Sequence, residues 1–211
     1  MSGFLNKDGR VIVDKLIVAI QTNKEYLSDI DGLIGDGDHG INMNKGFTMC
    51  QERLEDGMNM SEALKTLGRV LMMEIGGSMG PLYGTLFNKM ARASKGEEVI
   101  TREVFGRMLS DAVAGIADLG NAKVGDKTLM DVLIPADEAY KAALAADKDF
   151  AGCLEDMKKA AEAGWLSTKD LVAKIGRASR LGERSRGVLD AGATSCNLIL
   201  QTMADAIIEL I

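Results

Sequence analysis

The sequence predicts an all-α fold: an up-and-down antiparallel bundle or barrel of eight helices, forming one domain over residues 1–211. Three observations support this. The chain has only two prolines. It is rich in Ala, Leu, Met, Lys and Glu, which lose little entropy in a helix. Its apolar residues recur every three to four positions. With 211 residues, 46% of them hydrophobic, the chain can fill one ordinary core.

The first four helices follow from apolar periodicity and from one proline. An apolar row at Ile12, Leu16 and Ile20 predicts the first helix. Similar spacing predicts the second and third. The fourth begins at Pro81, because proline suits the first turn of a helix. We expect these helices at about residues 8–27, 41–54, 61–74 and 81–94.

The last four helices are bounded by caps and glycine-rich stretches. Thr101 is an N-cap residue for the fifth helix, and Thr128 or the residue before it starts the sixth, which contains Pro135. The segment 176–192 is too rich in Gly, Arg and Ser to be regular. We expect these helices at about residues 101–119, 128–145, 149–174 and 194–210.

The connections alternate in character along the chain. Those after the odd-numbered helices carry glycines and polar groups, and they cover residues 28–40, 76–80, 120–127 and 176–193. The intervening connections are plain turns. Because alternate loops of an up-and-down bundle lie at the same end, the four special loops are predicted to form one pocket.

The segment 31–44 is the strongest functional signal. Its sequence, Asp-Gly-Leu-Ile-Gly-Asp-Gly-Asp-His-Gly-Ile-Asn-Met-Asn, holds three carboxylates, four glycines, two asparagines and the only histidine. Carboxylate oxygens suit hard cations such as Mg²⁺, and three so close together repel one another without a cation. Glycines let the loop fold tightly and aim its amides inward. The segment predicts a metal and phosphate site.

Two other interpretations of this segment are less favoured. Asp and Gly are ordinary turn and helix-cap residues, but three acids with two asparagines exceed what a turn needs. An EF-hand loop beginning at Asp36 places Ile41 where the sharp-turn glycine belongs and Phe47 where the bidentate glutamate belongs. Calcium sensing is therefore not expected. His39 is expected to contact a ligand rather than to act as a covalent nucleophile, since its acidic neighbours favour the protonated imidazole.

Two further loops have phosphate-binding character. Residues 76–85 expose glycine amides before a helix N-terminus, although Gly-Gly turns are also common structural features. This loop follows a helix and lacks the Lys-Ser/Thr ending of a Walker A motif, which excludes P-loop and Rossmann sites. The arginine-rich loop 176–187 is either a solvated basic loop or a partner for phosphate or a nucleobase. Asp190 is either a helix cap or a ligand contact.

Composition excludes several function classes. A net charge of −6 argues against nucleic-acid binding. The three cysteines are far apart in apolar helical patterns and are expected to be buried thiols. No apolar run is long enough to span a bilayer and no basic n-region opens the chain, so we expect a cytoplasmic protein that does not bind membranes.

Several motifs, in this order, resemble the nucleotide-binding L component of dihydroxyacetone kinases of the phosphotransferase-system-dependent type, also called glycerone kinases. The match runs nearly end to end. The resembling motifs lie at residues 34–40 (Ile-Gly-Asp-Gly-Asp-His-Gly), 77–84, 125–128 (Gly-Asp-Lys-Thr), 176–179 (Gly-Arg-Ala-Ser) and 181–185 (Leu-Gly-Glu-Arg-Ser).

The resemblance implies an eight-helix barrel with ADP or ATP and two Mg²⁺ ions at one end. Asp31, Asp36 and Asp38 match the metal ligands. No catalytic residue is expected beyond this metal and nucleotide site. The positions matching nucleotide contacts are His39, Gly40, Ile41, Asn42, Ser78, Met79, Gly120, Leu129, Arg177, Asp190, Ala191 and Gly192.

The implied activity is phosphoryl transfer, through a Mg-nucleotide, to dihydroxyacetone or a similar ketose bound on a separate K subunit. The phosphoryl donor is either ATP or a phosphotransferase-system protein. The alternative function is a nucleotide- or metal-sensing module that binds a transcription regulator without catalysis of its own.

Four positions depart from the family pattern. The family has Ala-Ser where this chain has Ser78-Met79, so the hydroxyl lies one residue earlier in this chain. Leu129 replaces a methionine, Arg180 a tyrosine and Ala191 a proline. These departures suggest a paralogue that acts on another short ketose.

Overall fold

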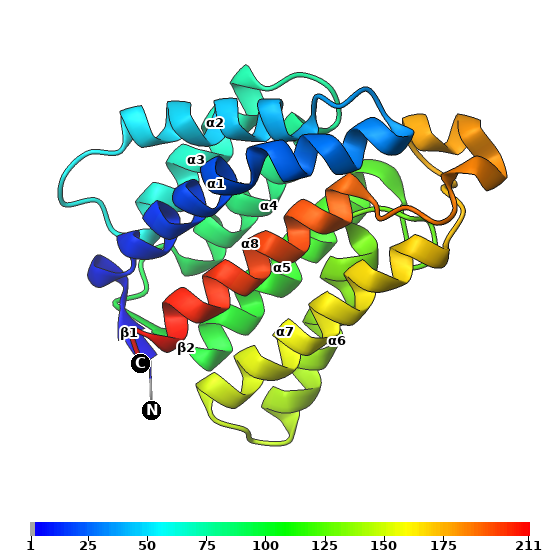
Figure 1. Ribbon diagram of the computed structural model, residues 1–211. Helices are drawn as coiled ribbons and strands as arrows, with labels where there is room; N and C mark the ends of the chain where they lie inside the picture. Colours follow the sequence, from blue (N-terminus) through cyan, green and yellow to red (C-terminus); the bar gives the residue numbers. More distant parts are fainter. Residues whose placement is uncertain (1–2) are drawn as a thin grey trace.

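The computed structural model describes residues 3–211 and confirms the all-α fold class (Figure 1). Within these residues the chain forms eight α-helices. They are α1 (Arg10–Ile34), α2 (His39–Arg53), α3 (Met60–Glu74), α4 (Met79–Ser94), α5 (Arg102–Gly120), α6 (Met130–Ala145), α7 (Phe150–Ser167) and α8 (Ala191–Ile208).

The helices form a closed ring. Each helix packs against its neighbours in sequence, and α8 packs against α1 as well as α7. In Figure 1, α8 lies between α1 and α7. One continuous hydrophobic cluster receives side chains from all eight helices. Its aromatic members include Phe47 against Phe87, with ring centroids 6.0 Å apart, and Phe105 against Tyr140, at 5.3 Å.

Short elements complete the fold. Strands β1 (Gly3–Leu5) and β2 (Val99–Thr101) pair antiparallel, with Phe4 opposite Ile100. Three 3-10 helices are η1 (Asn6–Asp8), η2 (Thr168–Asp170) and η3 (Arg177–Ser185). The strands were not predicted, because three-residue strands carry no readable periodicity. None of the helices within residues 3–211 combines the length and apolarity that crossing a bilayer requires. The three cysteines are buried free thiols, as predicted.

Helix α1 is longer than predicted, and this changes the metal loop. The sequence placed residues 28–40 in a loop, whereas α1 continues to Ile34 and α2 begins at His39. Leu27, at the predicted end, and Ile34, at the end of the extension, are both buried, so burial of this face outweighs the turn-forming residues between them. Asp31 therefore lies on the last turn of a rigid helix rather than in a loop.

The connection between α7 and α8 also differs from the prediction. Helix α7 ends at Ser167 instead of continuing to about residue 174, and η2 follows it. The stretch expected to be irregular contains η3, which is interrupted at Gly182, where φ is 56° and ψ is −129°. Residues 168–190 thus form a long, structured loop. In Figure 1 this loop lies beside the C-terminal end of α1.

Candidate functional site

The loops that follow the odd-numbered helices form one pocket of about 470 Å³, as predicted from their alternation. This volume suits a small-molecule ligand. Each of the four loops contributes to the lining. The lining residues are Asp31, Ile34, Gly35, Asp36, Asp38, His39, Asn42, Gly76, Gly77, Ser78, Met79, Leu82, Tyr83, Lys127, Thr128, Leu129, Ile175, Gly176, Arg177, Ala178, Asp190, Ala191 and Gly192.

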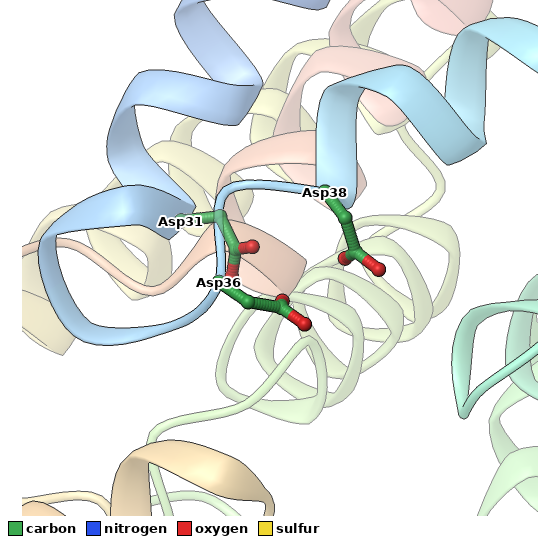
Figure 2. Close-up of side chains that lie close together, drawn as sticks. All are labelled: Asp31, Asp36 and Asp38. Atoms are coloured by element: carbon green, nitrogen blue, oxygen red, sulfur yellow. The ribbon is translucent and has the colours of Figure 1, made fainter.

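Three carboxylates converge at this pocket (Figure 2). Asp31 comes from the last turn of α1, Asp36 from the loop, and Asp38 from the N-cap position of α2. One oxygen from each lies within 4.8 Å of the others. Oxygen atoms of this kind, at this spacing, are ligands that hard divalent cations prefer.

Asp31 carries the clearest sign of a cation site. Its Oδ2 atom is buried and has no hydrogen-bond partner among the described residues. A buried carboxylate oxygen without a partner is costly unless a cation neutralises it. Gly35 leaves room for this carboxylate, because a Cβ at that position would lie 2.4 Å from Asp31 Oδ1. The residues present therefore fit a divalent metal ion.

Four helices begin at this pocket. The first residues of α2 and α4, and the residues that precede α6 and α8, all belong to the lining. Helix N-termini carry partial positive charge and unpaired N–H groups, so together they favour an anion. Gly76 and Gly77 add open backbone, since a Cβ at either position would meet nothing within 4 Å. The arrangement favours a polyanion beside the carboxylates.

Arg177 connects the loop 168–190 to the carboxylates. This residue begins η3, and its guanidinium forms an ion pair with Asp36. Both side chains remain substantially exposed, at 66% for Arg177 and 46% for Asp36. An exposed ion pair of this kind contributes little to stability, so the guanidinium can exchange its partner for a phosphate at small cost.

His39 belongs to a buried hydrogen-bonded network. Its Nε2 lies 2.8 Å from Ser195 Oγ, which lies 2.5 Å from the Tyr83 hydroxyl. The Tyr83 hydroxyl donates to the Gly192 carbonyl at 3.0 Å. Burial lowers the pKa of His39 to about 4 and outweighs the opposing effect of Asp31. The prediction that acidic neighbours favour the protonated imidazole is therefore wrong, because desolvation dominates.

Asp190 is a helix cap at the pocket wall. Its carboxylate accepts a hydrogen bond of 2.7 Å from the Ala193 amide at the start of α8. Burial raises the pKa of this carboxyl to about 6, although the Ala193 amide and Lys127 act against the rise. The two interpretations left open by the sequence are compatible, because the cap also lines the pocket.

The structure brings together most of the predicted site residues. All three aspartates line the pocket, as do nine of the predicted nucleotide contacts. Gly40, Ile41 and Gly120 do not line it. Gly40 lies where α2 meets α1, Ile41 is 64% exposed, and Gly120 ends α5. A nucleotide contact at these three positions stays a prediction.

Several lining residues had no predicted role. Tyr83, Lys127, Thr128, Gly176 and Ala178 fall inside the motifs that carry the family resemblance, so the sequence contained a signal for them. Leu82 also lies inside one of these motifs, at 77–84, whereas Ile175 is an apolar residue without a distinguishing pattern. Of the four positions that depart from the family, Met79, Leu129 and Ala191 line the pocket and Arg180 does not.

Comparisons with known proteins agree on one family. The family model of the DAK2 domain matches residues 33–205. The ADP-binding subunit DhaL of the PEP-dependent dihydroxyacetone kinase of Escherichia coli (strain K12) is 38% identical over 87% of this chain and 88% of its own length. The corresponding PTS-dependent subunit of Lactococcus lactis is 38% identical over 89% and 91%. A D-erythrulose kinase of Mycolicibacterium smegmatis is 33% identical over 92% of this chain but 34% of its own length.

Solved structures support the fold. The dihydroxyacetone kinase of C. freundii matches 97% of this chain with a TM-score of 0.70 and 22% identity, over 35% of its own chain. A second structure of that protein, in complex with AMP-PNP and Mg²⁺, matches with a TM-score of 0.69 and 21% identity. At this level of identity the likeness establishes a shared architecture.

Proposed function

The chain belongs to the DAK2 domain family, and we propose that it is the ADP-binding subunit of a PEP-dependent dihydroxyacetone kinase. The observation that carries this proposal is a cluster of three aspartates, one with a buried unpartnered oxygen, in a pocket where four helices begin. Such a site suits a metal-nucleotide complex, because it offers ligands for the cation and dipoles for the phosphates.

Asp31, Asp36 and Asp38 would hold magnesium. We propose two ions, since three carboxylates offer more oxygens than one Mg²⁺ with its retained waters requires. Magnesium, when bound, neutralises phosphate charge and orients the phosphates for in-line transfer. The rigid end of α1 fixes Asp31, while Gly37, with φ at 75°, lets the loop turn Asp36 and Asp38 toward it.

The remaining walls divide into a polar and an apolar part. The amides of Gly77 and Ser78, with the N-terminus of α4, would donate to phosphate oxygens. Arg177 is placed to donate to the same phosphates in exchange for Asp36. Leu129 and Ile175 provide apolar surface suited to the face of an adenine ring. Positioning and charge stabilisation of this kind dominate catalysis of phosphoryl transfer.

The phosphoryl donor and the acceptor come from partners. The relatives that match over nearly their whole length are described as PEP- or PTS-dependent ADP-binding subunits. We therefore favour a bound ADP that a phosphotransferase-system protein rephosphorylates, over exchange of free ATP. The ketose would bind on a separate K subunit, as dihydroxyacetone or as a four-carbon analogue such as erythrulose.

Exposed apolar side chains at the end of the bundle that holds the pocket favour docking of such a partner. They come from the ends of helices and from the connecting loops, and their exposed fractions run from 40% to 74%. Exposed apolar surface near a polar site is a feature of interaction surfaces. These residues are Leu33, Ile41, Met73, Leu119, Val124 and Ile175.

Replacing one carboxylate tests the function directly. Asp36→Asn keeps the side-chain shape and removes one anionic ligand. We expect weaker Mg-ADP binding by isothermal titration calorimetry. In a mixture reconstituted with a K subunit and a phosphoryl donor, we expect transfer to dihydroxyacetone to fall on the order of a hundredfold or more. Asp29→Asn, on the exposed face of α1, is the matched control. Full transfer by the Asp36 variant would refute the metal assignment.

Native mass spectrometry distinguishes the two donors. Purified protein in Mg²⁺ is washed and then challenged with excess ATP. Retained ADP with two Mg²⁺ that resists exchange supports the phosphotransferase-system donor, and ready exchange supports ATP. Nucleotide binding without transfer in any reconstituted mixture would favour the alternative, a sensing module that binds a transcription regulator.

A further inference from the structure

Lys127 is a buried lysine whose charge is held by backbone carbonyls. The residue is 1% exposed, and its Nζ donates to Thr168 O at 2.6 Å, to Leu171 O at 3.3 Å and to Val188 O. An ammonium group has three N–H donors. All three are used, so Lys127 has no donor left for a phosphate, although the residue lines the pocket.

The carbonyls that Lys127 binds lie at the two ends of the loop 168–190. Thr168 and Leu171 are at its start and Val188 is near its finish. Two other hydrogen bonds join the same ends: the Gly187 amide donates to Lys169 O at 2.7 Å, and the Asp190 amide to Thr168 Oγ1 at 3.1 Å. The two ends of the loop therefore lie close together and form a neck, and Lys127 binds at this neck.

The turn that carries Lys127 is anchored to α6. The Asp131 carboxylate accepts from the Gly125 amide at 2.5 Å and from the Thr128 amide at 2.6 Å. Lys127 itself adopts φ of 62°, in the left-handed region that costs free energy for any residue except glycine. Such a conformation persists where the surroundings determine it. Here it directs a long side chain from the anchored turn into the neck of the loop.

Charges near the ammonium support this arrangement. Burial and the nearby Arg186 guanidinium lower the pKa of Lys127, while the carboxylates of Asp190, Asp131 and Asp170 act in the opposite direction. Three carbonyl dipoles and these acids replace the solvation that the ammonium loses on burial. Removing the ammonium would leave the part-buried carbonyls of Leu171 and Val188 without this donor, while Thr168 O would keep only the Leu171 amide, at 3.3 Å.

The loop that Lys127 closes forms one wall of the pocket. Ile175, Gly176, Arg177 and Ala178 line the pocket and all lie between the carbonyls that Lys127 binds. Beyond the neck, this part of the loop is joined to the helical bundle through contacts of η3 with α1 and through the exposed ion pair of Arg177 with Asp36. Loss of the neck would therefore release this wall while the eight-helix core stays packed.

We propose that Lys127 is a positioning residue that closes the neck of the loop 168–190 and thereby sets the residence time of the bound nucleotide. The proposal rests on the proposed function, since it names a nucleotide as the occupant of the pocket. Lys127 acts on retention of the nucleotide through the main chain of the loop 168–190 and does not contact a phosphate.

The first test is hydrogen exchange in the nucleotide-free protein. Lys127→Met keeps the length of the side chain and removes the ammonium. We expect the amides of Gly187 and Asp190 to exchange at least about tenfold faster in this variant, because hydrogen bonds to a charged group are lost. Lys174→Met is the matched control: Lys174 is an exposed lysine on the same loop, and its replacement removes an ion pair of 3.4 Å with Asp126, outside the loop, and is expected to leave both amides unchanged. Unchanged exchange in Lys127→Met would overturn the proposal.

The second test uses stopped flow to measure the binding and release of a fluorescent nucleotide, methylanthraniloyl-ADP, in the presence of Mg²⁺. We expect the dissociation rate of Lys127→Met to rise about tenfold to a hundredfold and its association rate to stay within about twofold. A merely structural role would lower the amount of folded protein without changing release from the folded fraction. An unchanged dissociation rate would overturn the proposal.

Two outcomes are separated in advance. If Lys127→Met does not fold, hydrogen exchange in the wild type tests the proposal instead. Amides of Gly187 and Asp190 that exchange as fast as the amides of η3 would then refute closure of the neck. If the wild type does not bind Mg²⁺ with methylanthraniloyl-ADP, the proposed function fails, and hydrogen exchange alone then tests whether Lys127 closes the neck.

Discussion

Gly40 is where the packing of two helices determines the geometry of the metal site. It is the second residue of α2, and a Cβ built on it would lie 1.8 Å from Lys24 O and 2.7 Å from Ser28 Oγ on α1. Real Cβ contacts essentially never fall below 3.0 Å. A main-chain carbonyl cannot rotate away as a side chain can. Gly40→Ala must therefore separate the two helices locally by at least 3.0 − 1.8 = 1.2 Å.

This separation acts directly on the carboxylates. Asp31 is on α1 and Asp38 is two residues before Gly40, so moving the helices apart moves these two ligands apart. A shift of 1.2 Å is a quarter of the 4.8 Å span of the cluster. Magnesium requires near-ideal octahedral geometry. We expect Mg-ADP affinity to fall about tenfold to a hundredfold, and overpacking to cost about 1 to 3 kcal/mol of stability.

Calorimetric titration of Mg-ADP and urea unfolding measure the two effects. Gly32→Ala is the matched control, because it lies on the same turn of α1 as Asp31 and its Cβ would approach nothing closer than 3.8 Å. That variant is expected to keep its affinity and to gain up to about 1 kcal/mol from helix propensity. Wild-type affinity and stability in Gly40→Ala would show that the close approach of α1 and α2 is not what positions the carboxylates.

Three further predictions concern buried polar groups. Ser195→Ala removes the partner of His39 Nε2 and should cost about 1 to 3 kcal/mol in urea unfolding; an unchanged midpoint would refute a role for this bond. Because burial raises the pKa of Asp190 from 3.8 to about 6, the folded state binds that proton more tightly, and this contribution is lost as pH rises from about 4 to 7. In metal-free buffer, the stability of the wild type relative to Asp190→Asn should fall by about 1 to 3 kcal/mol over that range, and a flat difference would contradict the rise. Burial also raises the pKa of Cys50 to about 12, so this thiol should not react with Ellman's reagent at pH 8 before unfolding.

Local sequence patterns predicted most of the fold. Apolar periodicity, caps and glycine-rich stretches together located all eight helices, and Thr101 and Pro81 lie within the caps or first turns where they were expected. The alternation of loops predicted one pocket, since that inference requires only the helix count and the short connections. The predicted end of α1 was wrong. Turn-forming residues are a local signal, whereas the burial of Ile34 depends on the partner helix.

The site residues divide in the same way. The three aspartates are close in sequence, so their clustering was readable. Lys127 lies in a family motif, but its contacts could not be predicted, because the carbonyls it binds lie 41 to 61 residues away and a main-chain acceptor has no sequence signature. The protonation of His39 was predicted wrongly for a related reason. Its acidic neighbours are visible in the sequence, but the burial that outweighs them comes from the assembled fold.

The topology itself explains why one pocket can hold a cation and an anion together. In an up-and-down ring, the end that receives the C-termini of the odd-numbered helices also receives the N-termini of the even-numbered ones. Asp31 sits at the C-terminus of α1, where the helix dipole is negative and a second negative charge is unfavourable. A few residues away, α2 begins with its positive end. A metal ion offsets the negative charge at the end of α1, and a phosphate offsets the positive end of α2. A complex of the two therefore satisfies a charge arrangement that neither ion satisfies alone.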